Sequence, residues 1–151
     1  SFPSIRTRDI REKASIMDNV LFQKIQRLKE EVFYLRTNRD RFLTGIRASI
    51  DNRKIVERSV FLCAEMVLDI ADLIIVKRGF PKPATYREAI HDLGEFKIIP
   101  EDFAYNFVYI AGLRNFLAHE YLKETIPTLE DFLNNKLADV ERFLGLIEEK
   151  G

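Results

Sequence analysis

The chain has 151 residues, the usual size of one domain, and 46% of them are hydrophobic and 32% charged, as in soluble globular proteins. Its formal charge is zero, but residues 1–16 carry four basic and two acidic side chains, which leaves a net charge of −2 on residues 17–151. Broad binding of duplex nucleic acid depends on many cationic contacts to phosphates. We therefore expect no DNA partner, and only local contacts to a short or single-stranded target.

Cysteine content and hydropathy favour a cytoplasmic protein. Cys63 is the only cysteine, which excludes a disulfide within the chain and a multi-cysteine zinc site. Glu65, Asp69 and Asp72 interrupt the longest apolar run, and nothing approaches the roughly 20 apolar residues of a membrane span. A reducing cytoplasmic setting without a membrane anchor fits both observations.

The first sixteen residues contain no apolar segment like that of a secretory signal, and Met17 is a candidate for the natural start of the chain. We expect residues 1–16 to be a poorly ordered N-terminal extension or tail. Residues 17–151 are then expected to form a single helical domain.

A long amphipathic helix is expected from Met17. Its apolar residues are spaced four, three, four and three apart, which places them on one face. They are Leu21, Ile25, Leu28, Val32 and Leu35. Thr37 and Asn38 either break this helix or merely lie on its surface before a second segment that runs through Phe42 and Ile46.

The most apolar stretch, residues 53–78, predicts a helix at the centre of the fold. Four polar residues fall on one side of it: Arg58, Glu65, Asp69 and Asp72. This stripe either faces solvent or faces the helix expected over residues 101–118, in which case Glu65 and Asp69 would orient the cations of that helix. No metal site is expected here, because these carboxylates have no histidine at ligand spacing.

A short helix follows a rigid connection. Gly79 ends the central helix and two prolines come next. Thr85 and Glu88 then form a capping box that opens a helix through His91. Glu88 and His91 also make one Glu-x-x-His pair, which a di-iron bundle needs twice. We therefore interpret His91 as an ordinary surface histidine and expect no metal or other cofactor.

Residues 101–118 predict one helix, starting after Pro100, with two packing faces. An apolar stripe points to the core and consists of Phe103, Phe107, Ile110, Leu113 and Leu117. Beside it runs a row of mostly small residues, Ala104, Val108, Ala111 and Asn115, flanked by Gly112. Small side chains let another helix approach closely, so we expect a second, symmetric packing surface between two copies of the chain.

The last helix is expected to start at Thr128, because Ile126 and Pro127 stop the preceding segment. Its apolar residues repeat four, three, four and three apart, and are Leu133, Leu137, Val140, Leu144 and Ile147. The sequence has no strand-like alternation, phosphate-binding loop or internal repeat. The fold class that follows is all-α, an antiparallel bundle of four to five helices.

The side chains best suited to catalysis or phosphate binding lie between Gly112 and Tyr121, and include Arg114, Asn115 and His119. On a helix Asn115 and His119 share a face, and the length of an arginine allows Arg114 to reach toward His119. A guanidinium binds the anionic oxygens of a phosphodiester, and an imidazole transfers protons at neutral pH. The alternative is a surface histidine with an unrelated arginine.

The pattern Arg114-x4-His119-x-Tyr121 resembles the motif of HEPN-domain ribonucleases, and in this form it is similar to the HepT toxins of HEPN/MNT, or type VII, toxin–antitoxin systems. The likeness covers roughly residues 17–148. It includes Glu65 and Asp69 of the central helix, the segment Thr85-Tyr86-Arg87-Glu88-Ala89 that opens a short helix, and Gly112-Leu113-Arg114-Asn115 before the histidine. It implies a HEPN-like helical domain, a homodimer with a composite cleft between its protomers, and RNA such as tRNA or mRNA as the substrate. It also implies that Tyr121 accepts AMP from an MNT-type nucleotidyltransferase antitoxin, which silences the ribonuclease.

Cleavage of RNA by its own 2′-hydroxyl needs a base, an acid and positive charge, but no metal in principle. One chain offers one motif histidine, so a two-fold dimer would bring the second. We assign His119 to proton transfer, Arg114 to phosphate stabilisation and Asn115 to orienting the scissile group. Two other functions stay open: a catalytically silent module that binds a nucleotide or a nucleotidyltransferase, and a purely structural dimer.

Overall fold

The computed structural model describes residues 2–119 and 122–150, and the regular elements in these ranges are all helical. They are α1 (Phe2–Thr37), α2 (Arg39–Ala48), α3 (Ile50–Lys77), α4 (Tyr86–Glu95), α5 (Glu101–Phe107), α6 (Tyr109–His119), α7 (Ile126–Asp131), a short π-helix η1 (Phe132–Lys136) and α8 (Leu137–Lys150). The expected all-α bundle is confirmed. Within the described ranges, no helix is both long and apolar enough to cross a membrane.

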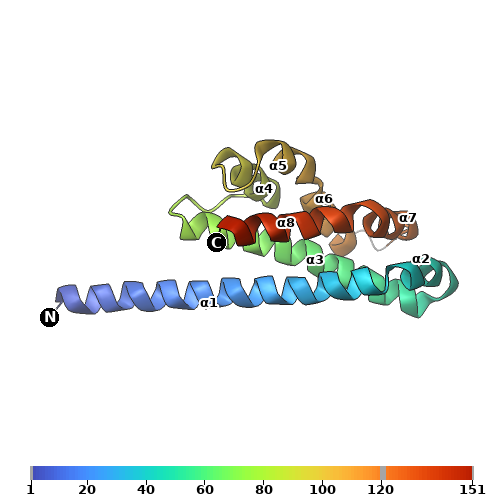
Figure 1. Ribbon diagram of the computed structural model, residues 1–151, viewed down its shortest axis with the longest axis horizontal. Coiled ribbons are helices and arrows are strands. Elements are labelled where there is room, and N and C mark those ends of the chain that lie inside the picture. Colours follow the sequence, from blue (N-terminus) through green and yellow to red (C-terminus); the bar gives the residue numbers. More distant parts are fainter. Residues whose placement is uncertain (1, 120–121, 151) are drawn as a thin grey trace.

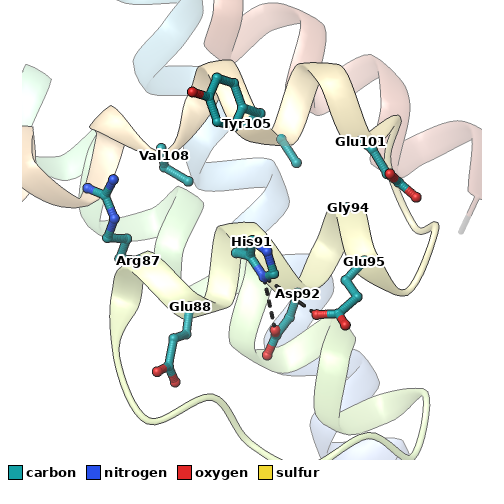
Figure 2. Close-up of a pocket in the computed structure, with 10 residues that line it drawn as sticks. Arg87, Glu88, His91, Asp92, Gly94, Glu95, Glu101, Tyr105 and Val108 are labelled. Carbon is teal, nitrogen blue, oxygen red and sulfur yellow. Dashed lines mark ion pairs between the residues drawn. The ribbon is translucent and has the colours of Figure 1, made fainter.

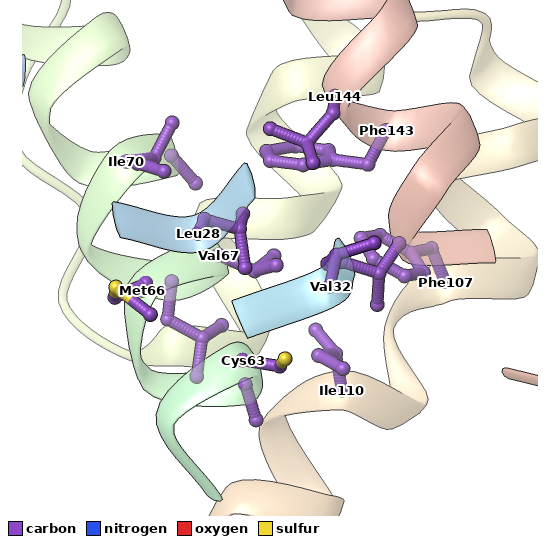
Figure 3. Close-up of a cluster of buried hydrophobic side chains, with 14 of the residues drawn as sticks. Leu28, Val32, Cys63, Met66, Val67, Ile70, Phe107, Ile110, Phe143 and Leu144 are labelled. Carbon is purple, nitrogen blue, oxygen red and sulfur yellow. The ribbon is translucent and has the colours of Figure 1, made fainter. Parts of the chain in front are cut away.

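The core forms where α1, α3, α5, α6 and α8 meet. Figure 3 shows their side chains converging, among them Leu28, Val67, Ile110 and Phe143, which are fully buried. Burial of each such side chain stabilises the fold by about 1.5 to 3 kcal/mol before the loss of conformational entropy is counted. Helix α3 contacts α1, α2, α4, α6 and α7, which confirms the central position predicted for residues 53–78.

Helix α1 starts at Phe2 rather than near Met17. Residues 4–16 contain neither glycine nor proline, and Pro3 lies in the first turn, where a missing N–H costs nothing. The added turns extend past the other helices (Figure 1), and the first of the described α1 side chains to join the core is Leu21. Of the two alternatives left open at Thr37 and Asn38, the structure shows the break, since α1 ends at Thr37.

The connection to α4 has the predicted signals. Gly79 follows α3 in the left-handed conformation, with φ of 86°, which glycine adopts without strain. Thr85 caps α4, because its hydroxyl oxygen accepts a hydrogen bond from the backbone N–H of Glu88 at 3.1 Å. Helix α4 continues past His91 to Glu95, one turn farther than expected.

The single helix expected from residue 101 is broken at Val108 into α5 and α6. In a straight helix, Phe107 and Tyr109 would point about 200° apart. The break turns both toward α8: the Phe107 ring lies 5.5 Å from that of Phe143, and the Tyr109 hydroxyl donates to Asp139 at 2.6 Å. Because no glycine or proline marks this break, packing against α8 is its physical cause.

Pro127 begins α7 instead of ending the preceding segment, so the predicted start at Thr128 is wrong by two residues. Proline is well tolerated in a first helical turn. The carboxylate of Glu124 accepts hydrogen bonds from the N–H groups of Thr125 and Ile126, at 3.0 and 3.1 Å. These bonds satisfy donors that the start of a helix leaves unpaired.

Candidate active site

The guanidinium of Arg114 on α6 is held by a carboxylate of α3. Its Nε donates to Oε2 of Glu65 at 3.2 Å, and its Nη1 donates to Oδ1 of Asn115 at 3.2 Å. The side chains of this ion pair are only 21% and 23% exposed, so solvent screens it less than a surface pair. The acidic stripe of α3 was expected to face either solvent or the helix that carries Arg114. Glu65 faces that helix.

Two aromatic rings flank the same guanidinium. Its carbon lies 5.2 Å from the ring centroid of Tyr86 and 5.6 Å from that of Phe61, within the range of cation–π attraction. The Tyr86 hydroxyl also donates to Oε1 of Glu65 at 3.3 Å. Arg114 is thus oriented by four neighbours before any ligand binds, namely Glu65, Asn115, Tyr86 and Phe61. Its Nη2 donors are not used by these contacts.

Tyr86 is the residue of this cluster that the sequence argument missed. Burial, followed by the negative charge of Glu65, raises the pKa of Tyr86, which keeps the phenol protonated as a hydrogen-bond donor at neutral pH. In the sequence Tyr86 belongs to the segment 85–89, which contributes to the HepT likeness, but no role in the site was predicted for it. Only the packing of α4 on α3 places that ring beside Arg114.

His119 is the last residue of α6 and is exposed, as is Asn115 one turn earlier. Both lie on one face of the helix, because they are four residues apart. The described contacts of Arg114 do not include His119. The two predicted catalytic residues, Arg114 and His119, are therefore not in contact within one protomer. Tyr121, the expected AMP acceptor, lies outside the residues that the structure describes.

Asp69 does not orient Arg114, which corrects one of the two supporting roles predicted for the acids of α3. Its carboxylate pairs with Nζ of Lys24 on α1 at 3.0 Å. Asp69 lies about 6 Å farther along α3 than Glu65, one helical turn, and at that level the helix packs against α1.

The row of small residues from Ala104 to Asn115 was predicted to pack against a second copy of the chain, but part of it packs within the same chain. Ala104 is buried against α4 of the same chain, where a Cβ added to Gly94 would lie 2.6 Å from the Ala104 Cβ. Ala111 is buried as well, whereas Gly112 and Asn115 are exposed. Helix α4 therefore covers the start of the expected dimer face, and the part open to a second copy is the C-terminal half of α6.

A hollow of about 860 Å³ lies between α4 and α5. Figure 2 shows His91 and Glu95 on one wall and Tyr105 on the other. The His91 Nδ1 lies 3.7 Å from Asp92 and 3.5 Å from Glu95. His91 is exposed, which confirms its predicted position on the surface.

Comparison with known sequences agrees with this geometry. The family model described as "Ribonuclease HepT-like" matches residues 20–147. A tRNA nuclease HepT of Aphanizomenon flos-aquae is 35% identical over 74 residues, 49% of this chain and 50% of that protein. An mRNA nuclease HepT of Shewanella oneidensis is 26% identical over 86 residues, 57% of this chain and 65% of that protein. The chain thus spans between half and two thirds of the length of these curated relatives.

The fold is also similar to that of solved structures. One is the tri-AMPylated HEPN toxin of Shewanella oneidensis in complex with an MNT antitoxin. Its TM-score is 0.73 at 20% sequence identity, and the match covers 86% of this chain and 97% of that one. At this identity the likeness supports the helical architecture alone.

Proposed function

We propose that this chain, which belongs to the HepT-like ribonuclease family, is an endoribonuclease that uses Arg114, Asn115 and His119. The family assignment rests on the match over residues 20–147. The observation that carries the proposal is the setting of Arg114. A guanidinium fixed by Glu65 and two aromatic rings, with donors still available, is suited to an anionic phosphate.

The proposed reaction is attack of an RNA 2′-hydroxyl on the adjacent phosphorus. His119 accepts the hydroxyl proton or returns a proton to the leaving 5′-oxygen, and Arg114 stabilises the charge that develops on the phosphate oxygens. The bond to the 5′-oxygen breaks as the bond to the 2′-oxygen forms. The products are a 2′,3′-cyclic phosphate and a 5′-hydroxyl, and side chains alone can perform both proton transfers, without a metal.

We propose a composite site between two copies of the chain. A base and an acid are both required, but each protomer contributes one motif histidine. The exposure of Gly112, Asn115 and His119 supports a two-fold contact at the C-terminal half of α6. In such a dimer the Arg114 of one protomer approaches the His119 of its partner, which would supply the pairing that one protomer lacks.

The partner proposed for the chain is a nucleotidyltransferase. The Shewanella HEPN toxin is AMPylated and in complex with an MNT antitoxin, and relatives of this chain are named tRNA and mRNA nucleases. We propose that this chain is a cytoplasmic toxin that cleaves one of these RNA classes. Adenylation of Tyr121 would place a phosphate near the motif cations and compete with RNA.

The proposal is tested with purified protein, total RNA and tRNA in excess chelator. We expect cleavage with cyclic-phosphate ends, reduced by about 10² to 10⁴ in His119→Ala and Arg114→Ala. Circular dichroism checks that both variants remain folded. Activity that survives His119→Ala, or that chelator abolishes, would favour the silent binding module instead.

Tyr121 is tested by co-expression with a nucleotidyltransferase encoded beside the gene. We expect intact-mass spectrometry to find one or more added adenylates on the wild-type chain and none on Tyr121→Phe. The modified protein should lose RNA cleavage. An active transferase that leaves Tyr121 unmodified in the presence of ATP would rule out this mode of neutralisation.

A further inference from the structure

A second hollow lies beside Asn115, where α6, the end of α3 and the loop into α4 meet. Its volume of about 540 Å³ is within the roughly 300 to 1,000 Å³ of small-molecule sites. The residues used below all line it: Asp72, Lys82, Tyr86, Arg87, Gly112 and Asn115.

This hollow adjoins the atoms proposed to bind the scissile phosphate. Tyr86 forms part of its wall with the ring that lies 5.2 Å from the Arg114 guanidinium. Asn115 forms another part, and accepts a hydrogen bond from Arg114. A group in the hollow would therefore lie next to a phosphate bound to Arg114.

On the α6 side the hollow is lined by a glycine, Gly112. A Cβ added to Gly112 would meet no atom within 4 Å, so neither packing nor a tight helix contact explains the absence of a side chain there. Glycine in a helix interior costs about 0.5 to 1 kcal/mol relative to alanine. Gly112 therefore borders open space beside the candidate site.

On the α3 side, the hollow is lined by Asp72, whose carboxylate is in an energetically unfavourable environment. Oδ1 of Asp72 is buried and has no hydrogen-bond partner among the described residues. Burial raises the pKa of Asp72, while the nearby charge of Lys82 opposes that rise. Unsatisfied buried polar groups are rare, and natural proteins retain them mainly where function requires them. Lys82 and Arg87, both exposed, add two cations to the rim.

We propose that this hollow binds one unpaired nucleotide of the RNA, next to the scissile phosphate. Asp72 would accept a hydrogen bond from the base or the ribose, and Lys82 and Arg87 would contact the neighbouring backbone phosphate. Only an unstacked nucleotide can enter such a hollow, because bases in a duplex are stacked and paired. The proposal rests on the proposed function, in that the ligand is RNA.

The test fills the hollow through Gly112. In the His119→Ala background, which prevents turnover, fluorescence anisotropy measures binding of labelled single-stranded oligoadenylate and oligouridylate. We expect Gly112→Leu to weaken binding by about tenfold or more, the effect of losing the contacts of one bound nucleotide. The matched control is Gly145→Leu on α8, since that glycine also has open space around it, and its affinity should equal that of the parent.

Two further variants keep the test independent of the glycine. Asp72→Ala should weaken binding because it removes the acceptor oxygens. Lys82→Ala should weaken binding while reducing the slope of log affinity against log salt by about one. Light scattering shows whether each variant keeps the oligomeric mass of the parent. If Gly112→Leu fails to fold, or changes the oligomeric mass because Gly112 also lies in the proposed two-fold contact, these two variants decide the question.

The outcomes separate the two proposals. If wild-type protein cleaves RNA but all three variants bind the oligonucleotides as the parent does, the nucleotide subsite is overturned and the ribonuclease function stands. If the protein neither binds nor cleaves RNA, both fall. Weaker binding by Gly112→Leu at unchanged oligomeric mass supports the subsite.

Discussion

The orientation of Arg114 is set by Glu65 and Tyr86, and this arrangement has a cost as well as a benefit. The carboxylate neutralises much of the arginine charge, which weakens attraction for a phosphate at a distance. In return it fixes the guanidinium plane, and a fixed donor stabilises a transition state better than a mobile one. Glu65 and Tyr86 are therefore positioning residues.

Removing the charge of Glu65 separates these two effects. We expect Glu65→Gln to lower kcat by about tenfold or more, because Arg114 loses its fixed orientation, while KM stays the same or falls because a negative charge is removed. Tyr86→Phe retains the ring and should lose less activity than Tyr86→Ala. Steady-state cleavage of a defined RNA measures both, and an unchanged kcat in Glu65→Gln would show that the ion pair is only structural.

Replacing Asp72 by asparagine is expected to stabilise the folded protein in a pH-dependent way. Burial raises its pKa in the folded state, so ionising it destabilises the fold. This cost is absent below the unfolded pKa and complete above the folded one. We expect Asp72→Asn to raise Tm at neutral pH, with the gain vanishing as the pH falls toward about 4. The control is Asp40→Asn, because the Asp40 side chain is 93% exposed; an equal gain there would contradict the interpretation.

At the scale of the elements, the contact of α4 with α5 depends on one glycine. A Cβ on Gly94 would lie 2.6 Å from the Ala104 Cβ, closer than real side chains approach. We expect Gly94→Ala to destabilise the protein by about 1 to 3 kcal/mol, whereas Gly145→Ala, in open space, should stabilise it by about 0.5 to 1 kcal/mol. Urea denaturation measures both. Equal effects of the two substitutions would show that α4 does not pack closely here.

The elements that the sequence predicted well are those with local signals. The four-three spacing located the core-facing residues of α1 and α8, Gly79 located the end of α3, and the Thr85 cap located the start of α4. The break at Val108 was missed, because contacts with α8 impose it and no local residue does. Pro127 was misread, since proline both ends helices and begins them.

The candidate site was predicted in part for the same reason. Helical spacing placed Glu65 and Asp69 on one polar side of α3 but left open whether that side faces solvent or Arg114, and the structure shows that Glu65 contacts Arg114. Spacing could not distinguish Glu65 from Asp69, because the two share a face and only the position of Lys24 separates them. Tyr86 belongs to another helix, so no spacing rule could have located it.

At the scale of the whole molecule, the charge distribution limits how RNA can bind. Residues 17–151 carry a net charge of −2, so attraction for RNA must come from a few local cations rather than from a basic surface. Arg114, Lys82 and Arg87 are such cations on adjoining elements. This distribution suits a short unpaired segment better than an extended duplex.

The central claim is that two copies of the chain form one ribonuclease site, and subunit mixing tests it most directly. Wild-type protein is exchanged with an equal amount of the inactive chain carrying both Arg114→Ala and His119→Ala, and the rate of RNA cleavage is measured in excess chelator. If both protomers are required, only wild-type pairs are active and the rate falls to about one quarter of that of undiluted wild type at the same total concentration. A rate of about one half would show that each protomer acts alone and would contradict the composite site.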